Sequence, residues 1–365
     1  MNDNLYCVIM AGGTTNQLWP VSRNSRPKQF LPSKIVGESF LRLTYKRFLK
    51  VVPQKNILVV TLSRFADLVR EQLPELCPEN LLLEPYGRQT APCIAYSTYK
   101  ILKRNPDATV LTTPADHEID DDEAFIEDMK EMLGHASAYP VLMTLGIPPR
   151  EPETCYGYIQ VAGRRSVENQ ESAVKVKTFV EKPDKALAEV FCNSKEFFWN
   201  SGIFAWRAAV IKEELEKFTP EIVSLFADWE NNLDTENEGS FLDKAYSGCQ
   251  KLSIDYGVME NTEKAWLYPG HFNWMDLDTW GSIYRNAEEM DQEGNVVTVE
   301  KTLVKDNKDI LLLSTTKKKK LYAIKGLKGF MVIDTDDALL ICPCDDKEVQ
   351  DLVSGLAMPG YEEYK

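Results

Sequence analysis

The sequence predicts an α/β protein in which a parallel sheet with helices on both faces is followed by a smaller all-β part. Two observations predict this fold class. The first 147 residues alternate between short apolar runs and segments with helical spacing of apolar residues. From residue 291 onward, short strand-like pieces follow one another with turn residues between them. A chain of 365 residues is long enough for two domains, which we place at residues 1–290 and 291–365.

Apolar runs are the predicted strands of the first domain. They are continuous rather than alternating, which is typical of strands buried on both faces of a parallel sheet. The runs are residues 5–10, 56–62, 80–85, 109–114 and 141–147. Helical spacing between them, as in Leu41, Tyr45 and Phe48, indicates helices that cover the sheet. A ligand is then expected at the carboxyl ends of the strands. Residues 12–13, 84–85 and 114–116 fall at such ends.

The rest of the chain is predicted to combine strands and helices as far as residue 290 and to form short strands after it. Strands are predicted at residues 156–161, 173–180 and 197–206, with a helix over residues 184–193. After residue 290, the closely spaced short strands suggest a coil of parallel strands. The four lysines from Lys317 to Lys320 are interpreted as a solvated turn, with anion binding as the alternative.

Charge excludes several classes of protein. The formal net charge is −14, which argues against a nucleic-acid partner. No apolar stretch approaches the roughly 20 residues of a membrane span, and no secretion signal is visible. Residues 4–37 nevertheless contain no acidic residue, although Arg23, Arg26, Lys28 and Lys34 fall inside this window. A local cationic segment in an acidic chain suggests a site for a small anion, with a solvated basic loop as the alternative.

The positions of cysteine, histidine and glycine limit which redox, metal and nucleotide sites the chain can contain. The eight cysteines contain no C-x-x-C pair, so we expect reduced thiols in a cytoplasmic protein. Three histidines exclude a His-rich metal site. Gly12 and Gly13 follow the first predicted strand, where paired glycines let a backbone approach a phosphate. The dinucleotide fingerprint G-x-G-x-x-G and the P-loop are both absent from this segment.

Ordered motifs along nearly the whole chain resemble one family, the mannose-1-phosphate guanylyltransferases. The motifs are LWPVSR (18–23), PKQF (27–30), EPYGRQTAPCIA (84–95), PADHEI (114–119), YGYI (156–159), FVEKP (179–183), WNSGIFAW (199–206), SIDYGVME (253–260), FNWMDLDTW (272–280) and GLKGFMVIDTDDALLI (326–341). The resemblance implies a Rossmann-like nucleotidyltransferase domain of the glycosyltransferase-A type with a small C-terminal left-handed β-helix. It also implies transfer of GMP from GTP to mannose 1-phosphate, in which a phosphate oxygen attacks the α-phosphorus and pyrophosphate leaves.

The resemblance further nominates site residues. Those implied to be catalytic are Lys28, Asp116 and Asp276, of which Asp116 and Asp276 would hold Mg²⁺. Those implied to bind the nucleotide are Ala11, Gly12, Gly13, Lys28, Arg88, Thr90 and Asp116. Those implied to bind the sugar phosphate are Gly157, Glu181, Lys182 and Asn200.

The nucleotide loop departs from the family pattern Gly-Gly-x-Gly-x-Arg-Leu-Trp-Pro. Thr15 stands at the second glycine position and Gln17 at the arginine position. In the family that arginine faces the triphosphate, and glutamine lacks its charge and its bidentate fork. Losing an arginine that stabilises a transferring phosphoryl group costs about 10³–10⁵ in rate. Arg23 and Arg26 are the candidates to replace the missing charge.

Two smaller departures leave their consequences open. Gln89 stands where the family prefers asparagine, and Asp278 replaces a glycine two residues after Asp276. A carboxylate at position 278 would either join the metal site or repel the substrate phosphates.

Three functions compete on these grounds. The main hypothesis is an active guanylyltransferase that makes GDP-mannose, with GTP and mannose 1-phosphate as partners and neither nucleic acid nor membrane. One alternative is a catalytically impaired homologue that binds a nucleotide sugar and regulates a partner, as Gln17 and Thr15 suggest. The other is a nucleotidyltransferase for another sugar phosphate or base. A homodimer is the working expectation for the oligomeric state.

Overall fold

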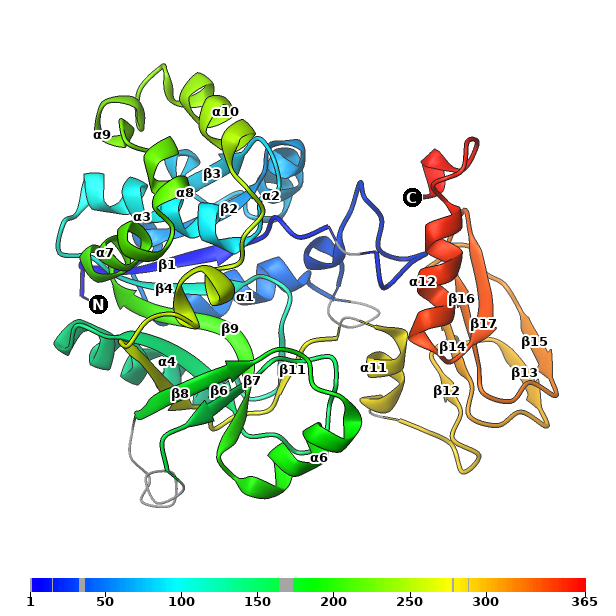
Figure 1. Cartoon of the computed structure of the whole chain (residues 1–365). Helices are drawn as coiled ribbons and strands as arrows, with labels where there is room; N and C mark the ends of the chain where they lie inside the picture. The colour runs from blue at the N-terminus through cyan, green and yellow to red at the C-terminus, as the bar shows by residue number, and fades with distance from the viewer. Residues whose placement is uncertain (1, 15, 33–36, 164–172, 278, 288) are drawn as a thin grey trace. The chain divides into compact units, whose positions relative to one another are not determined.

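The computed structural model describes residues 2–14, 16–32, 37–163, 173–277, 279–287 and 289–365. Its backbone contacts divide the chain into two compact units (Figure 1). The first unit comprises Met1–Gly12, Thr44–Ala115 and Ile119–Trp274. The second unit comprises Gly13–Leu43, Asp116–Glu118 and Met275–Lys365. The units divide the chain elsewhere than at residue 290, and the predicted domain boundary there stays a prediction.

A nine-stranded sheet organises the first unit, in the order β3-β2-β1-β4-β9-β6-β10-β8-β7. Its strands are β1 (Leu5–Met10), β2 (Ile57–Leu62), β3 (Leu81–Glu84), β4 (Thr109–Pro114), β6 (Leu142–Ile147), β7 (Tyr158–Val161), β8 (Val174–Val180), β9 (Phe197–Arg207) and β10 (Ala265–Pro269). Strands β1 to β4 are parallel, so the ends of β1, β3 and β4 meet at one edge of the sheet. The strands predicted from apolar runs in the first 147 residues are confirmed.

The parallel order predicted from the first 147 residues is interrupted at β9, which comes from the part of the chain that the sequence predicts to be mixed. This strand lies antiparallel between β4 and β6, and β7 and β8 also pair antiparallel. An apolar run identifies a strand but not its neighbours, which long-range packing selects. Where β6 passes β10, a Cβ on Gly146 would lie 2.4 Å from Leu267 Cδ1, so this position requires glycine.

Helices cover both faces of this sheet, with α3 and α7 on one face and α4 on the other (Figure 1). Tyr6 and Val8 of β1 pack into a core that includes residues of α3 and α7, and the alternate residues Cys7 and Ile9 are also fully buried. The helices are α1 (Phe40–Phe48), α2 (Ala66–Gln72), α3 (Thr90–Arg104), α4 (Asp122–Ala138), α6 (Lys185–Ser194), α7 (Ala208–Phe218), α8 (Pro220–Leu225), α9 (Trp229–Asn232) and α10 (Glu238–Gly248).

Parallel ladders organise the second unit. The strands are β12 (Val296–Val297), β13 (Thr302–Lys305), β14 (Leu311–Ser314), β15 (Tyr322–Lys325), β16 (Phe330–Asp334) and β17 (Leu339–Pro343), with helices α11 (Trp280–Arg285) and α12 (Asp346–Gly355). Strands β12, β14 and β16 form one parallel ladder and β13 and β15 another. These parallel pairings agree with the predicted coil of parallel strands, but β17 departs from it because it pairs antiparallel with β16. The pairings do not determine the hand of the coil, so the left-handed β-helix stays a prediction.

The segment Gly13–Leu43 belongs to the second unit, and part of it is buried in the apolar core of that unit. Leu18 and Trp280 are buried in one cluster with Leu311 of β14 and Met331 of β16. Two short strands, β5 (Glu118–Ile119) and β11 (Trp274–Met275), each run from one unit into the other along the chain.

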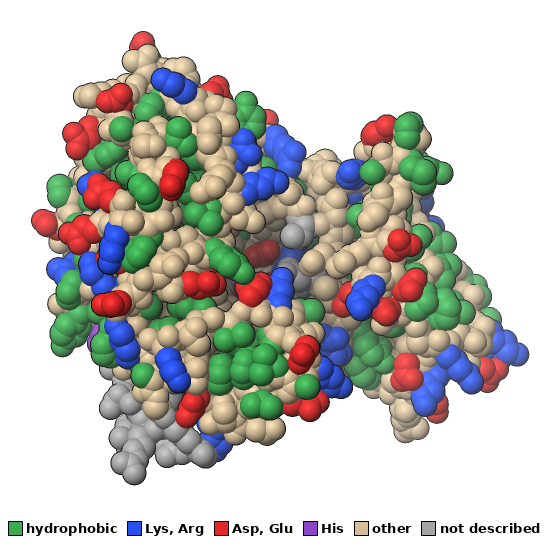
Figure 2. Space-filling view, in the orientation of Figure 1, with side chains coloured by type: hydrophobic (Ala, Val, Ile, Leu, Met, Phe, Trp, Pro, Cys, Tyr) green, Lys and Arg blue, Asp and Glu red, His purple; other side chains and the backbone are tan. Residues whose placement is uncertain are grey.

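Lysines gather on the surface of the second unit over β13 and β15 (Figure 2). The predicted solvated turn at Lys317 to Lys320 is an exposed segment between β14 and β15. Within it, Lys320 pairs with Asp334 at 2.8 Å. In the described part of the chain, no helix has the length and apolar character that crossing a membrane requires.

Candidate functional site

Three predicted catalytic residues come together in the second unit. Lys28 begins a short 3₁₀ turn (Lys28–Phe30) directly after Pro27, and its side chain is 2% exposed. Its Nζ lies 2.6 Å from Asp276 Oδ1 and 3.7 Å from Asp116 Oδ2. The ammonium also lies over the ring of Phe40, 5.5 Å from its centre. A buried cation with carboxylates beside it satisfies the requirement that buried charges are paired.

The two carboxylates fit the oxygen-donor chemistry of Mg²⁺. Both Asp116 and Asp276 approach the same Nζ, and their side chains are 28% and 23% exposed, so they converge and remain reachable from solvent. Mg²⁺ commonly binds through one or two carboxylates together with substrate phosphates and water. Among the described residues, no group of three or more His, Cys, Asp or Glu could hold a metal ion. Asp278 lies outside the described residues, so its role stays a prediction.

The segment after β1 carries the predicted phosphate-binding backbone. Ala11 N donates to Val60 O at 2.7 Å, and Thr61 Oγ1 donates to Ala11 O at 2.8 Å, so the first residue of the loop is held by β2. A Cβ on Gly12 would lie 3.1 Å from Glu84 Oε2, which makes glycine the fitting residue there. Gly13 belongs to the second unit, where its carbonyl accepts from Gln29 Nε2 at 2.9 Å.

Glu84 opens one of the family motifs, but it was not among the predicted site residues. It ends β3 and is 5% exposed. Burial raises the pKa of this carboxyl from 4.5 to about 7, although the hydroxyl of Tyr246, which donates to Oε1 at 2.9 Å, lowers it. A carboxyl with a perturbed pKa beside a glycine that is predicted to bind phosphate is a functional-site candidate. Its position at the end of a predicted strand is the feature of the sequence that could have identified it as a site residue.

The loop from Arg88 to Thr90 is hydrogen-bonded to α10 and to the segment that follows it. Arg88 Nε donates to Tyr246 O at 3.0 Å, and Thr90 Oγ1 accepts from Ile254 N at 2.8 Å. Between them Gln89 has φ +66°, a left-handed conformation that is strained for a side chain other than glycine. Such strain is typical of loops whose shape is required for binding.

Three of the four predicted sugar-phosphate residues come together in the first unit. A Cβ on Gly157 would lie 3.7 Å from Asn200 Cβ and 3.8 Å from Glu181 Oε2. Asn200 N donates to Gly157 O at 2.8 Å, which fixes β9 to the start of β7. Lys182 is exposed and follows Glu181 at the end of β8.

Asp255 joins this group although the sequence did not nominate it. It begins a single π-helical turn (Asp255–Met259) and accepts from Asn200 Nδ2 at 2.7 Å. Burial raises the pKa of Asp255, the hydrogen bond from Asn200 opposes this, and the nearby charge of Glu181 raises it further.

The altered nucleotide loop contains Gln17 in a half-buried position. Among the described residues, no donor reaches its buried Oε1. Thr15, the other departure from the family pattern, lies outside the described residues.

Arg23 does not offer a free guanidinium to replace the missing arginine. Its Nε donates to Pro20 O at 2.6 Å, its Nη1 to Tyr364 O at 2.9 Å, and its Nη2 to Asp337 at 2.9 Å. All three nitrogens are therefore used within the second unit. Arg26 is exposed and stays a candidate.

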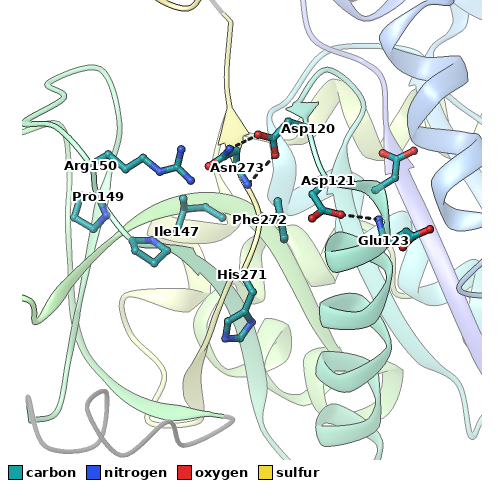
Figure 3. Close-up of a pocket in the computed structure, with 12 residues that line it drawn as sticks. Asp120, Asp121, Glu123, Ile147, Pro149, Arg150, His271, Phe272 and Asn273 are labelled. Carbon is teal, nitrogen blue, oxygen red and sulfur yellow. Dashed lines mark hydrogen bonds between the residues drawn. The ribbon is translucent and has the colours of Figure 1, made fainter.

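A hollow of about 680 Å³ opens in the first unit, and it contains none of the predicted site residues (Figure 3). Three of its four carboxyl groups have partners within the protein: Asp120 accepts from Asn273 N at 3.0 Å, and Asp121 caps α4 by accepting from Glu123 N at 3.1 Å. Asp122 pairs with Arg47 at 2.6 Å. The hollow therefore does not assign a ligand.

Comparison with known proteins agrees with this geometry. Residues 6–293 match a family model described as nucleotidyl transferase. Xanthan biosynthesis protein XanB of Xanthomonas campestris pv. campestris is 37% identical over 366 residues, which cover 98% of this chain and 74% of that protein. Mannose-1-phosphate guanylyltransferase of Escherichia coli K12 is 35% identical over 353 residues, which cover 95% of this chain and 72% of that protein.

A solved structure is similar over almost the same extent. The crystal structure of mannose-1-phosphate geranyltransferase from Thermus thermophilus matches with a TM-score of 0.84 at 32% identity, covering 97% of this chain and 100% of that one. These matches confirm the Rossmann-like α/β fold that the sequence predicts.

Proposed function

Because the chain belongs to the nucleotidyl transferase family, we propose that it transfers GMP from GTP to mannose 1-phosphate in the cytoplasm, giving GDP-mannose and pyrophosphate. The observation that carries the proposal is the buried Lys28 ammonium beside the carboxylates of Asp116 and Asp276. The activity for which the E. coli relative is named supports the choice of sugar and base.

The reaction needs positioning and charge neutralisation rather than a covalent nucleophile. A phosphate oxygen of mannose 1-phosphate forms a bond to the α-phosphorus of GTP. The bond from that phosphorus to the oxygen bridging the α- and β-phosphates breaks, and pyrophosphate leaves with the electron pair. Lys28 supplies a fixed positive charge for the phosphates. Asp116 and Asp276 would hold Mg²⁺, which neutralises phosphate charge when bound.

Residues of the first unit would bind the two substrates. The backbone at Ala11 and Gly12 approaches the nucleotide phosphates, with Arg88 and Thr90 on the same side.

The sugar phosphate would be bound by a separate set of groups in the same unit. Glu181 and Asn200 suit the sugar hydroxyls because their side chains accept or donate hydrogen bonds. Lys182 suits the phosphate because its ammonium is a compact positive charge.

A second candidate function is supported by the altered loop. Gln17 replaces the family arginine, and Arg23 uses its guanidinium elsewhere in the second unit. A chain with this loop would bind the nucleotide sugar with little turnover and act by regulating a partner.

One assay separates these functions: pyrophosphate release from GTP plus mannose 1-phosphate with Mg²⁺. We expect measurable release by the unaltered protein, a higher kcat for Gln17→Arg, and none above background for Asp276→Asn. Restoring an arginine at a transferring phosphoryl group is worth up to about 10³–10⁵ in rate where no other cation covers its role.

Other outcomes would redirect the assignment. No turnover by either the unaltered protein or Gln17→Arg, with GDP-mannose still bound in calorimetry, would support the regulatory function. Faster release with ATP or with glucose 1-phosphate would instead indicate a nucleotidyltransferase for another base or sugar.

A further inference from the structure

The side-chain amide of Asn200 has a defined orientation. Its Oδ1 accepts from Gly202 N at 3.1 Å, and its Nδ2 donates to Asp255 Oδ1 at 2.7 Å. A backbone N–H can only donate and a carboxylate can only accept, so the two partners together fix which end of the amide is which. One Nδ2 hydrogen is used by Asp255, and the amide carries a second.

The carboxyl groups around Asn200 make this place suitable for neutral donors rather than for phosphate. Burial raises the pKa of Asp255, and the charge of Glu181 adds to the rise. Carboxyl oxygens accept hydrogen bonds from hydroxyl groups, and the phosphate is better received by the ammonium of Lys182.

Resting on the proposed function, we propose that Asp255 is a positioning residue of the sugar site. It holds Asn200 so that the remaining amide hydrogen, together with Glu181 beside Gly157, meets the hydroxyl groups of the hexose. The site therefore orients the sugar with its hydroxyls toward Asp255 and its phosphate toward Lys182.

The test compares Asp255→Ala with Asp255→Asn and with the matched control Glu260→Gln. Asp255→Ala removes the acceptor for Asn200, so KM for mannose 1-phosphate should rise about 10- to 100-fold while KM for GTP stays within about twofold. Asp255→Asn retains an acceptor oxygen and should recover most of this loss. Glu260 is exposed, and Glu260→Gln removes a neighbouring negative charge without touching Asn200, so its KM values should stay near those of the unaltered protein.

A double variant distinguishes positioning from a merely structural tie. In Asn200→Asp with Asp255→Asn, the hydrogen bond persists with donor and acceptor exchanged, but the amide hydrogen no longer comes from position 200. The thermal midpoint should stay within a few degrees of that of the unaltered protein, whereas KM for the sugar phosphate should rise as in Asp255→Ala. Full recovery of KM in this double variant would show that Asp255 acts only as a structural tie and would overturn the proposal.

Further outcomes keep this inference separate from the proposed function. Turnover by the unaltered protein with equal KM values for Asp255→Ala and Glu260→Gln would overturn the inference alone. If the unaltered protein has no turnover, calorimetry with GDP-mannose decides: weaker binding by Asp255→Ala than by Glu260→Gln supports the inference without the proposed reaction. No binding by the unaltered protein would overturn both.

Discussion

Glu84 should make the stability of the protein fall as the pH rises. Its carboxyl is buried at the end of β3, and burial raises its pKa from 4.5 to about 7. Glu84→Gln removes the ionisation while keeping the shape of the side chain and an oxygen that accepts from Tyr246. Burial also raises the pKa of the Tyr246 hydroxyl, so this donor keeps its proton across the range tested.

The direction and size of the effect follow from proton linkage. Below pH 4.5, Glu84 is protonated in the folded and unfolded states and contributes no pH dependence. Between pH 4.5 and about pH 7 the unfolded chain releases the proton and the folded protein retains it, so the free energy of unfolding falls. The shift corresponds to about 3 kcal/mol in total, of which about 2–3 kcal/mol is lost between pH 5 and pH 8.

Urea unfolding of both proteins at pH 5, 6, 7 and 8 measures this difference, because every other titrating group is common to them. The unaltered protein should lose about 2–3 kcal/mol relative to Glu84→Gln between pH 5 and pH 8, most of it below about pH 7. Glu71→Gln, which removes an exposed carboxyl from α2, is the control for a change of charge alone. A difference between the unaltered protein and Glu84→Gln that is constant within about 0.5 kcal/mol from pH 5 to pH 8 would refute the reasoning.

Two further predictions concern packing. Gly146→Ala should lower the free energy of unfolding by about 1–3 kcal/mol in urea titrations, because the new Cβ would lie 2.4 Å from Leu267 Cδ1; an unchanged midpoint would mean that β6 and β10 pack more loosely than described. Arg23→Ala removes one of the two donors to Tyr364 O, the other being Trp19 Nε1, and also the pair with Asp337, so stability should fall by about 1–3 kcal/mol, and limited proteolysis should cleave the C-terminal segment faster. Equal cleavage rates for the variant and the unaltered protein would contradict this account.

Local sequence patterns predicted the strands and the edge of the sheet where function was expected. Continuous apolar runs identify buried strands because both faces of such strands exclude water. The strand ends at Met10, Glu84 and Pro114 then follow, since parallel strands end at one edge. The partners of Lys28 did not follow from any pattern, because Asp276 is 248 residues away. Resemblance to a family nominated both residues as catalytic without predicting their contact, and the structure brings their atoms to 2.6 Å.

Long-range packing explains what the sequence did not predict. The antiparallel entry of β9 depends on which strands are already neighbours, and its own residues do not record that choice. Asp255 and Glu84 stand inside motifs that the sequence displays, yet their perturbed pKa values come from burial that only the folded chain creates. The hydrogen bond from Asn200 to Asp255 likewise joins residues 55 positions apart.

The N-terminal segment, residues 4–37, shows that the number of charged residues in a segment can differ from the charge that is available to a ligand. Residues 4–37 contain Arg23, Arg26, Lys28 and Lys34 without an acidic residue, which suggests a site for a small anion or a solvated basic loop. In the folded chain, Arg23 is held by Asp337 and by backbone carbonyls. This segment therefore has less positive charge available to bind a ligand than its composition implies. For that reason the structure favours a large rather than a small gain in turnover when Gln17 is replaced by arginine.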